Sequence, residues 1–456
     1  MGKKYDFDYI VIGSGPAGSA IAKSLATTKK FSVAIIENNG FGGNNVCTLD
    51  IPYLVGQSFI HSFYKVSQSP EIGGQNLHYN FPTIASHQTA ISNLLSNNIK
   101  KHLENAGIAC IGGYAHFIDE HTVVVGEQKY TAENFILATG SKLSTGDIIG
   151  LNSVKYLTPN TVPKIRRLPK FVFVIGGGPT GCEIAEYFAK LGTKVIIMEQ
   201  FSSLLPKEDP EAGSTLRDYF TNELGIMVIT DSKVVSIEND GNFKRVIFKN
   251  DNKDKAVRVD CIVLATGSVP NTDCGLENAG VRYSKTGAII TNKFFQTTAK
   301  NIYAIGDCLD GNYSSTERAE YEASILSDSI IHHSKGFADY KGFIRTVNTC
   351  PSIACVGQTE ARLNRHHAKY KKSIVYLKDI PASAIDGLDY GFVKIVASRR
   401  TNHILGATIM APNAELIAEE FAIAIRHRLT ALEIASTPHI SNSYNYAVKL
   451  AAKQLV

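Results

Sequence analysis

The 456-residue sequence has no tryptophan, only four methionines and a formal net charge of only +5. No apolar run reaches about 18 residues, so we expect no membrane-spanning helix. The lysines and arginines never gather into a basic block, and we therefore expect no binding to nucleic acid. Eight cysteines spread over so long a chain favour reduced thiols and a cytoplasmic location over a disulfide framework. The histidines have no metal-ligand spacing, so no metal site is predicted.

A glycine-rich turn follows the first apolar segment. Residues 7–12 predict a strand, and the next residues, GSGPAG, place Gly13, Gly15 and Gly18 in G-x-G-x-x-G spacing before a predicted helix. A second predicted strand, FSVAIIE, ends at Glu37. The glycines permit a tight turn, a close approach of backbone N–H groups to a pyrophosphate, and close helix–strand packing, while the acid can bind a ribose diol. The segment therefore predicts a dinucleotide site.

The same pattern recurs later in the chain. Gly176, Gly178 and Gly181 follow the apolar segment FVFVI, and the next predicted strand ends at Glu199. Two complete fingerprints indicate two dinucleotides, most simply a bound flavin reduced by a nicotinamide. A carboxylate at Glu199 bonds a free 2′-hydroxyl and repels a 2′-phosphate, which favours NADH over NADPH.

Four further motifs lie in order along the chain. They are ILATGS (136–141), VLATGSVPN (263–271), NIYAIGDC (301–308) and TCPSIACVGQTE (349–360). With the two fingerprints, they make nearly the whole chain resemble the pyridine nucleotide–disulfide oxidoreductase family, which includes dihydrolipoamide dehydrogenase, glutathione reductase, mercuric reductase and soluble transhydrogenase.

The resemblance implies an α/β fold with two Rossmann-like dinucleotide-binding domains and a C-terminal α+β dimerisation domain. We expect the FAD-binding domain at 1–145 and 268–335, the NAD-binding domain at 146–267 and the dimerisation domain at 336–456. A homodimer follows from the same resemblance.

The resemblance also assigns cofactor-binding residues. For FAD these are Gly13, Gly15, Pro16, Ala17, Gly18, Glu37, Gly43, Asn44, Ala115, Thr139, Gly140 and Asp307. For the nicotinamide cofactor they are Gly176, Gly178, Thr180, Gly181, Glu183, Glu199 and Gly267.

The sequence departs from the family where the family carries its redox disulfide. The two cysteine positions are Asn45 and Asp50, and the position of a lysine near the flavin is Leu54. At the C-terminus, Ser441 and Tyr446 stand where the family has a catalytic His and Glu, and His439 lies two residues away. The disulfide relay and its acid–base partner are both expected to be missing.

Other thiols are poor substitutes. Cys47 lies three residues before Asp50 and is expected on roughly the same helical face, where it could approach the flavin without a partner cysteine. Cys350 and Cys355 are expected to be two core cysteines in a strand of the dimerisation domain.

Asp50 and Glu183 are the candidate catalytic residues. In the family, a Glu at position 183 would pair with the lysine that is Leu54 here, so its charge is uncompensated or it is protonated. An ionised Asp50 beside a reduced flavin would either take up a proton or lower the flavin potential.

The resulting hypothesis is an FAD-dependent NADH:acceptor oxidoreductase. Electrons would leave directly from the flavin to a quinone, oxygen, another nicotinamide or a protein electron carrier. Two alternatives stay open: a non-catalytic subunit or sensor that binds FAD and NADH, and dihydrolipoamide dehydrogenase-type activity, which Asn45 and Asp50 disfavour.

Overall fold

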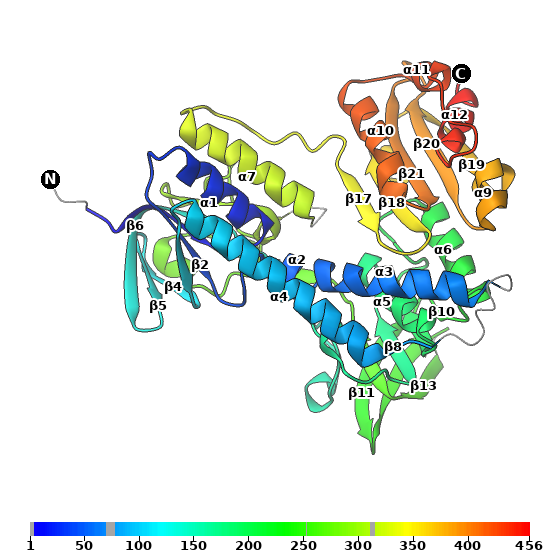
Figure 1. The fold of residues 1–456 in the computed structure, drawn as a ribbon, viewed down its shortest axis with the longest axis horizontal. Helices are drawn as coiled ribbons and strands as arrows, with labels where there is room; N and C mark the ends of the chain where they lie inside the picture. Colours follow the sequence, from blue (N-terminus) through cyan, green and yellow to red (C-terminus); the bar gives the residue numbers. More distant parts are fainter. Residues whose placement is uncertain (1–3, 70–77, 252, 311–314) are drawn as a thin grey trace.

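The computed structural model describes residues 4–69, 78–251, 253–310 and 315–456. Figure 1 shows two sheet-and-helix units and a C-terminal antiparallel sheet, with a pair of long helices running from the first unit toward the other two. Among the described helices, none is long and apolar enough to cross a membrane.

The first sheet has seven strands in the order β3-β2-β1-β6-β5-β4, with β16 paired to β6. β1, β2, β3 and β16 run parallel to their neighbours, whereas β4, β5 and β6 form an antiparallel excursion that returns to the sheet. The strands are β1 (Phe7–Ile12), β2 (Val33–Glu37), β3 (Ala109–Gly112), β4 (Ala115–Asp119), β5 (Thr122–Val125), β6 (Gln128–Leu137) and β16 (Ile302–Ala304).

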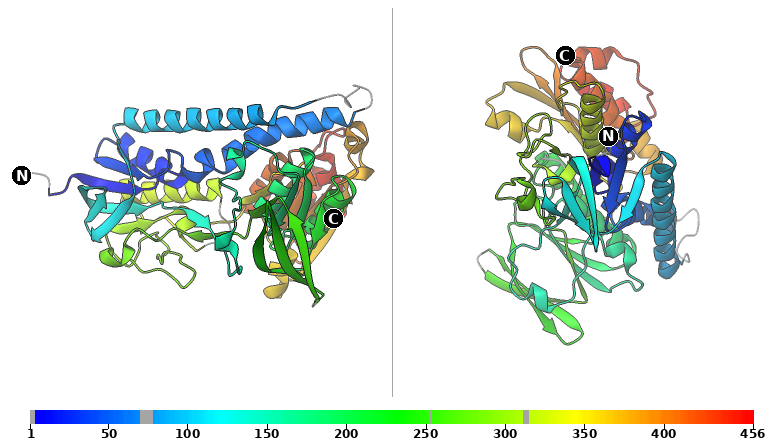
Figure 2. Two further views of the ribbon diagram at one scale, coloured as in Figure 1. Left: turned by 90° about the horizontal axis from the view of Figure 1, so that it is seen from below. Right: turned by 90° about the vertical axis from the view of Figure 1, so that its left-hand side faces the viewer.

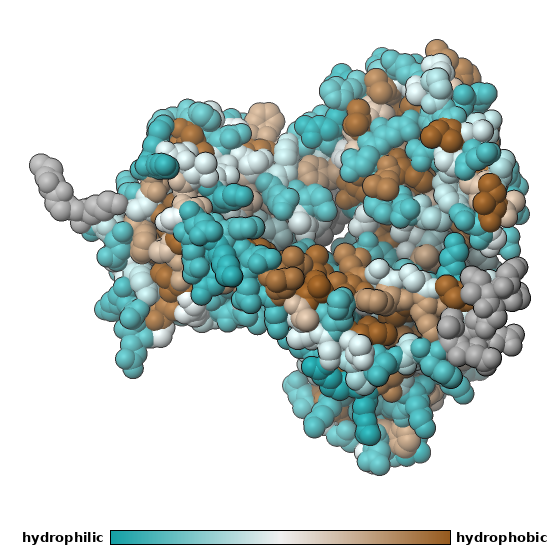
Figure 3. All heavy atoms as spheres, in the orientation of Figure 1, coloured by the Kyte–Doolittle hydropathy of each residue, from teal (hydrophilic) through white to brown (hydrophobic). Residues whose placement is uncertain are grey.

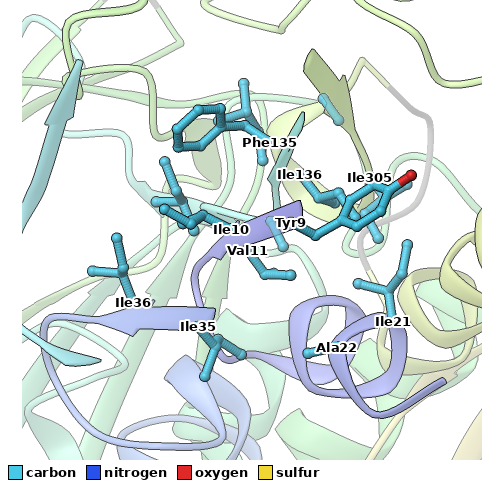
Figure 4. Packing of buried hydrophobic residues seen from close by; sticks show 14 of the residues in the cluster. Tyr9, Ile10, Val11, Ile21, Ala22, Ile35, Ile36, Phe135, Ile136 and Ile305 are labelled. Atoms are coloured by element: carbon cyan, nitrogen blue, oxygen red, sulfur yellow. The ribbon is translucent and has the colours of Figure 1, made fainter. Parts of the chain in front are cut away.

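The central strands of this sheet are apolar on both faces because helices cover them. α1 (Pro16–Thr27) and α7 (Thr316–Ile331) pack beside each other on one side. Figure 4 shows Ile10, Ile35 and Ile136 of the sheet together with Ile21 of α1, and all four are fully buried. This core fixes the strand ends from which the glycine-rich loops emerge.

Three helices follow β2: α2 (Gly43–Cys47), α3 (Asp50–Ser67) and α4 (Phe81–Asn105). Asn80 caps the N-terminus of α4, where its side chain accepts a hydrogen bond from Thr83 N, and the helix ends just before Gly107. Leu94 of α4 is exposed, whereas Ser92 faces α2 and donates to Val46 O at 2.7 Å.

Figure 2 shows α3 and α4 lying along one side of the molecule. Apolar side chains gather over this helix pair on the face seen in Figure 3. A groove of about 330 Å³ between the two helices is lined by Phe59, Phe63, Tyr79 and Ile84. It lies toward the start of α4.

The second unit contains a parallel sheet in the order β10-β9-β8-β14 and an antiparallel sheet, β11-β12-β13. A short pair, β7 and β15, joins the segments that connect this unit to the first. The elements are β7 (Ser141–Leu143), β8 (Phe171–Ile175), α5 (Pro179–Lys190), β9 (Lys194–Met198), α6 (Pro210–Asn222), β10 (Met227–Ile229), β11 (Lys233–Asp240), β12 (Phe243–Asn250), β13 (Lys253–Val259), β14 (Cys261–Leu264) and β15 (Ser268–Pro270).

The C-terminal unit is a five-stranded antiparallel sheet in the order β17-β18-β21-β20-β19. Its elements are β17 (Ile344–Val347), β18 (Ser352–Gly357), α8 (Glu360–Arg365), β19 (Tyr370–Tyr376), α9 (Pro381–Asp386), β20 (Phe392–Ser398), β21 (Ile404–Ala411), α10 (Ala414–Arg426), α11 (Ala431–Ser436) and α12 (Tyr446–Lys453). Ile417 and Phe421 of α10 are buried against the sheet, as their spacing predicts.

A buried ion cluster joins the second unit to the C-terminal sheet. Lys394 of β20 is fully buried, and its Nζ lies 2.6 Å from Glu211 Oε2 and 3.4 Å from Asp209 Oδ2 at the start of α6. Glu360 of α8 also accepts from Lys394. Because the paired charges come from different units, the cluster fixes how α6 sits on the C-terminal sheet.

Candidate functional site

The first glycine-rich loop has space only for glycine at two of its predicted positions. Gly13 has a φ of +100°, and a Cβ there would lie 2.2 Å from Ala138 O. A Cβ at Gly18 would lie 1.8 Å from Gly13 O. Pro16 begins α1, and no side chain caps its N-terminus at Gly15, so the partial positive charge of that terminus is available to a phosphate.

Glu37 holds the same loop from the end of β2. Its Oε2 accepts hydrogen bonds from Ser14 N and Ser14 Oγ, both at 2.8 Å, and its Oε1 accepts from Asn39 N at 2.9 Å. Ala115 begins β4 close by, since the preceding Gly113 N donates to Glu37 O at 2.8 Å. The carboxylate is therefore fixed beside the loop, where a ribose would meet it.

The second glycine-rich loop repeats this geometry. A Cβ at Gly176 would lie 2.3 Å from Ala265 O, and one at Gly181 would lie 1.9 Å from Gly176 O. Glu199 Oε2 accepts from Gly177 N at 2.7 Å, and its Oε1 accepts from Phe201 N at 3.1 Å. Gly178 precedes Pro179 and Thr180 at the start of α5, which also lacks a side-chain cap.

The segment that contains Asp307 lies against the first loop. A Cβ at Gly306 would be 3.3 Å from the Cβ of Ala17 in α1. Gly306 N donates to Glu322 Oε2 at 2.7 Å, and the other oxygen of Glu322 accepts from Arg318 Nε at 2.8 Å and from Tyr340 Oη at 2.6 Å. This buried network positions the Asp307 turn beside the start of α1.

The two ATG segments hold each other. Thr139 Oγ1 donates to Asn271 O at 2.7 Å, Asn271 Nδ2 donates to Thr139 O at 2.9 Å, and Asn271 N donates to Gly140 O at 2.9 Å. Gly267 O accepts from Ser144 N at 2.9 Å. The structure thus brings Thr139, Gly140 and Gly267 together where the chain crosses between units.

Asn45 and Asp50, the two residues predicted at the disulfide positions, contact each other. Asn45 Nδ2 donates to Asp50 Oδ2 at 2.8 Å and to Thr316 Oγ1 at 2.7 Å. α2 is also close to the first loop, because a Cβ at Gly43 would lie 2.8 Å from Gly15 Cα. Asn44 extends from the same turn and donates to Ser141 O at 3.2 Å.

Cys47 does not lie near Asp50 on one helical face, and that expectation is wrong. α2 ends at Cys47, and α3 begins at Asp50 after a break in which Leu49 has φ −123° and ψ −92°. The thiol instead faces α4, with Ser96 Oγ at 3.7 Å. Burial raises the pKa of Cys47, which disfavours a thiolate.

The other cysteines are also single thiols, and none of the eight forms a disulfide in the structure. Cys355 is buried in β18 as expected. Cys350 is exposed and lies in the loop before that strand, so its assignment to the core is wrong. The described residues contain no cluster of histidine, cysteine and carboxylate side chains that could hold a metal.

Two carboxyl groups on α5, the partly buried Glu183 and the fully buried Glu186, have different charges around them. Burial raises the pKa of Glu183 to about 8, and the neighbouring charge of Asp50 adds to this effect. The carboxyl oxygen Oε1 of Glu183 accepts from Asn348 N at 2.7 Å. Burial would also raise the pKa of Glu186, but Lys190 at 2.9 Å and His61 at 3.4 Å outweigh it and lower that pKa.

The C-terminal candidates lie at the start of α12 and in the loop before it. Ser441 is exposed in the loop, and Tyr446 is the first residue of α12. His439 Nδ1 lies 2.8 Å from Thr437 O and its Nε2 lies 3.2 Å from Glu420 Oε1, so both ring nitrogens have partners within this chain. His439 is therefore not placed as a free acid or base.

Comparison with known proteins decides the family. Residues 7–323 match the model described as pyridine nucleotide-disulphide oxidoreductase, and residues 344–452 match the dimerisation domain of the same family. The chain belongs to this family. It is an FAD-dependent NAD(P)H oxidoreductase with a mixed α/β fold and a C-terminal dimerisation domain.

Its similarity to individual members is broad but moderate. Mercuric reductase from Bacillus cereus is 29% identical over 440 residues, which cover 95% of this chain and 69% of that protein. Soluble pyridine nucleotide transhydrogenase from Vibrio cholerae is 29% identical over 416 residues, covering 89% of this chain and 88% of the relative. The HOCl-induced flavoprotein disulfide reductase RclA from Escherichia coli has the same fold, with a TM-score of 0.87, 24% identity and coverage of 98% and 99%.

The residues of this oxidoreductase fit an FAD in the first loop. Glycines stand where a Cβ would clash with backbone, and α1 offers an uncapped N-terminus beside the fixed Glu37 carboxylate. The Asp307 turn closes the same space from α7. Together they provide backbone N–H groups, a helix N-terminus and a carboxylate in the arrangement that a dinucleotide requires.

Three supporting residues do not stand out in the sequence: Thr316, Glu322 and Asn348. Thr316 binds Asn45 across 271 residues of sequence, Glu322 binds Gly306 across 16, and Asn348 binds Glu183 across 165. The only local signal is the four-residue spacing of Arg318 and Glu322, which predicts an ion pair but not what that pair supports.

Proposed function

We propose that this protein oxidises NADH and passes the electrons directly to a small acceptor, without a disulfide relay. The observation that carries the proposal is the contact between Asn45 and Asp50, at 2.8 Å, at the two predicted disulfide positions. Neither side chain can undergo thiol–disulfide exchange, and Cys47 faces Ser96 instead.

The residues of the chain would bind and orient the two cofactors. Gly13, Gly18 and Glu37 would hold FAD, and the matching loop at Gly181 with Glu199 would hold NADH. FAD, when bound, supplies a two-electron centre that accepts a hydride and releases it to another molecule. The pKa of Glu183 is raised to about 8, so near neutral pH its protonated form, which would add no negative charge beside the nicotinamide, would be favoured.

Glu199 supports NADH rather than NADPH as the donor. Both of its oxygens already accept backbone N–H bonds, which keeps the carboxylate fixed at the ribose position. A 2′-phosphate there would face that carboxylate with no arginine among the three residues that follow. We expect kcat/KM to be higher with NADH, and a preference for NADPH above tenfold would contradict this assignment.

Anaerobic titration tests the absence of a relay. The FAD-loaded protein should consume about one NADH per FAD and develop no long-wavelength thiolate–flavin charge-transfer band. Consumption of two equivalents would show a second redox centre and refute the proposal. Steady-state turnover with a quinone or dye then separates a catalyst from a protein that only binds the cofactors.

The match of residues 344–452 to a dimerisation domain supports a homodimer as the working form. Sedimentation analysis of the FAD-loaded protein would test it, and a monomer at micromolar concentration would contradict it.

A further inference from the structure

Two carboxyl groups from different units lie near each other. Asp50 begins α3 and accepts a hydrogen bond from Asn45 of α2, the helix whose first residue, Gly43, packs on Gly15. Glu183 lies on α5 of the second unit, close enough for the charge of Asp50 to raise its pKa. A proton held on either group thus lies between α2, which packs on the first glycine-rich loop, and α5, which carries the last glycine of the second.

The Asp50 carboxyl is held in one orientation. Asn45 donates from its single amide nitrogen to Asp50 Oδ2 and to Thr316 Oγ1, so both of its N–H groups are used. Thr316 is the first residue of α7, the helix whose Glu322 also holds Gly306. Asp50 Oδ1 accepts no hydrogen bond from the described residues, and it is the oxygen left to meet a ligand.

The charges around Asp50 favour its protonated form. Burial raises its pKa, the Asn45 amide lowers it, and the negative charge of Glu317 on α7 raises it further. Glu183 lies on α5, near enough for the charge of Asp50 to raise the pKa of Glu183. Among the described residues, the charge that shifts the pKa of Asp50 is the negative charge of Glu317.

We propose that Asp50 donates a proton to the electron acceptor, and that the acceptor is therefore a quinone-type dicarbonyl compound. This inference rests on the proposed direct transfer from the flavin. The overall reaction is NADH + H⁺ + quinone → NAD⁺ + hydroquinone. The C4–H bond of NADH breaks, its hydride pair reduces the quinone by way of the flavin, and the proton from Asp50 completes the second hydroxyl group. Asp50 is then reprotonated from solvent.

Two other kinds of acceptor would not need this residue. A nicotinamide takes a hydride and no proton, and ferricyanide takes one electron and no proton. A quinone that accepts a hydride needs one proton, and a carboxyl group whose pKa is raised toward the working pH is better suited to general acid catalysis. A general acid at Asp50 would therefore favour the reduction of a quinone and would make no difference to a nicotinamide or to ferricyanide.

The test compares menadione with ferricyanide as acceptors for the same FAD-loaded preparation. In Asp50→Asn, NADH:menadione turnover should fall about 100-fold, because general acids typically contribute at least that much. In the same variant, the loss of NADH:ferricyanide turnover should be at least tenfold smaller than the loss with menadione. Equal losses with both acceptors, or no loss with menadione, would overturn the role of Asp50.

Glu317→Gln is the matched control for charge. Glu317 is exposed and outside the binding residues, but its charge raises the pKa of Asp50. In the unmodified protein, the ratio of menadione turnover to ferricyanide turnover should fall at high pH, where Asp50 loses its proton. In Glu317→Gln this fall should begin at lower pH, with the same maximum ratio. A fall at the same pH as in the unmodified protein, in Glu317→Gln and in Asp50→Asn alike, would contradict the inference.

A measurement without turnover completes the test. The midpoint potential of the bound flavin would be measured by dye equilibration between pH 5 and 9. Its plot against pH should show an inflection from the titration of Asp50, and this inflection should be absent in Asp50→Asn.

If ferricyanide is reduced but menadione is not, the direct-transfer function stands and this inference fails. If neither is reduced while NADH still binds, the proposed function itself fails.

Discussion

Glu183 and Glu186 provide a controlled comparison, because both lie on α5 and both accept a backbone N–H bond, from Asn348 and Cys350 respectively. Glu183 is partly buried and Glu186 is fully buried. Glu183 has a raised pKa, and Glu186 has a lowered one. Substituting each with Gln keeps the shape and the acceptor oxygen but removes the charge. The two variants should therefore change the pH dependence of stability in opposite ways.

The sign for Glu183 follows from proton linkage. Between its ordinary pKa of 4.5 and about 8, the folded state binds this proton and the unfolded state does not. Stability therefore falls as pH rises through that interval. At about 1.4 kcal/mol per pH unit, the interval corresponds to about 5 kcal/mol, which is an upper limit for a side chain that is not fully enclosed. Glu183→Gln should remove this loss.

Glu186 is the opposite case. Its lowered pKa gives a stabilisation that is present above the pKa of the unfolded state and is lost as pH falls through the lower, folded-state value. Glu186→Gln also leaves the buried Lys190 without its nearest anion, which costs about 3–5 kcal/mol.

Thermal unfolding of FAD-loaded protein at pH 5, 7 and 9 would measure both effects. Glu183→Gln should unfold with the unmodified protein at pH 5 and at a higher temperature at pH 9. Glu186→Gln should unfold at a lower temperature at all three pH values, because each lies above the ordinary pKa of 4.5 and the stabilisation is lost only below it. Parallel curves for Glu183→Gln and the unmodified protein across this range would refute the reasoning.

Three further predictions follow from the contacts. In Gly18→Val, a Cβ 1.8 Å from Gly13 O disrupts the first loop, so the purified protein should contain little FAD by visible absorbance. In Gly181→Val, a Cβ 1.9 Å from Gly176 O disrupts the second loop, so the protein should keep FAD but be reduced slowly by NADH in stopped-flow mixing. Lys394→Met leaves buried carboxylates unpaired and should lower the free energy of unfolding, measured by chemical denaturation, by about 3–5 kcal/mol. Lys372 is half-exposed, and the control variant Lys372→Met should lower it by about 0–1 kcal/mol. Leu54→Lys, which adds a cation one turn after Asp50, should lower the pKa of the nearby carboxyl groups and flatten the fall in thermal stability above neutral pH.

The sequence was enough to predict the two glycine-rich loops, because the glycines, the helix that follows and the acid at the end of the next strand all lie within about 25 residues. The clash of a Cβ at Gly13 or Gly176 with the backbone is the kind of constraint that G-x-G-x-x-G spacing encodes. The β4–β6 excursion and the end of α4 near Gly107 were predictable for the same reason.

The supporting contacts were not predictable because they join distant parts of the chain. The bond from Asn45 to Thr316 and the bond from Asn348 to Glu183 depend on how the units pack. The error at Cys47 had a local cause, since the sequence shows no proline or glycine at Thr48 and Leu49 to mark the break between α2 and α3.

The departures from the family pattern act in one direction. By the resemblance, Leu54 stands where the family has a cation near Glu183, and Asp50 stands where the family has a thiol. The first difference removes a positive charge and the second adds a carboxyl group, and the pKa values of Asp50 and Glu183 are both raised. Asn45 orients Asp50 and also binds Thr316 of α7. Under the proposed function, this orientation suits the delivery of a proton together with a hydride.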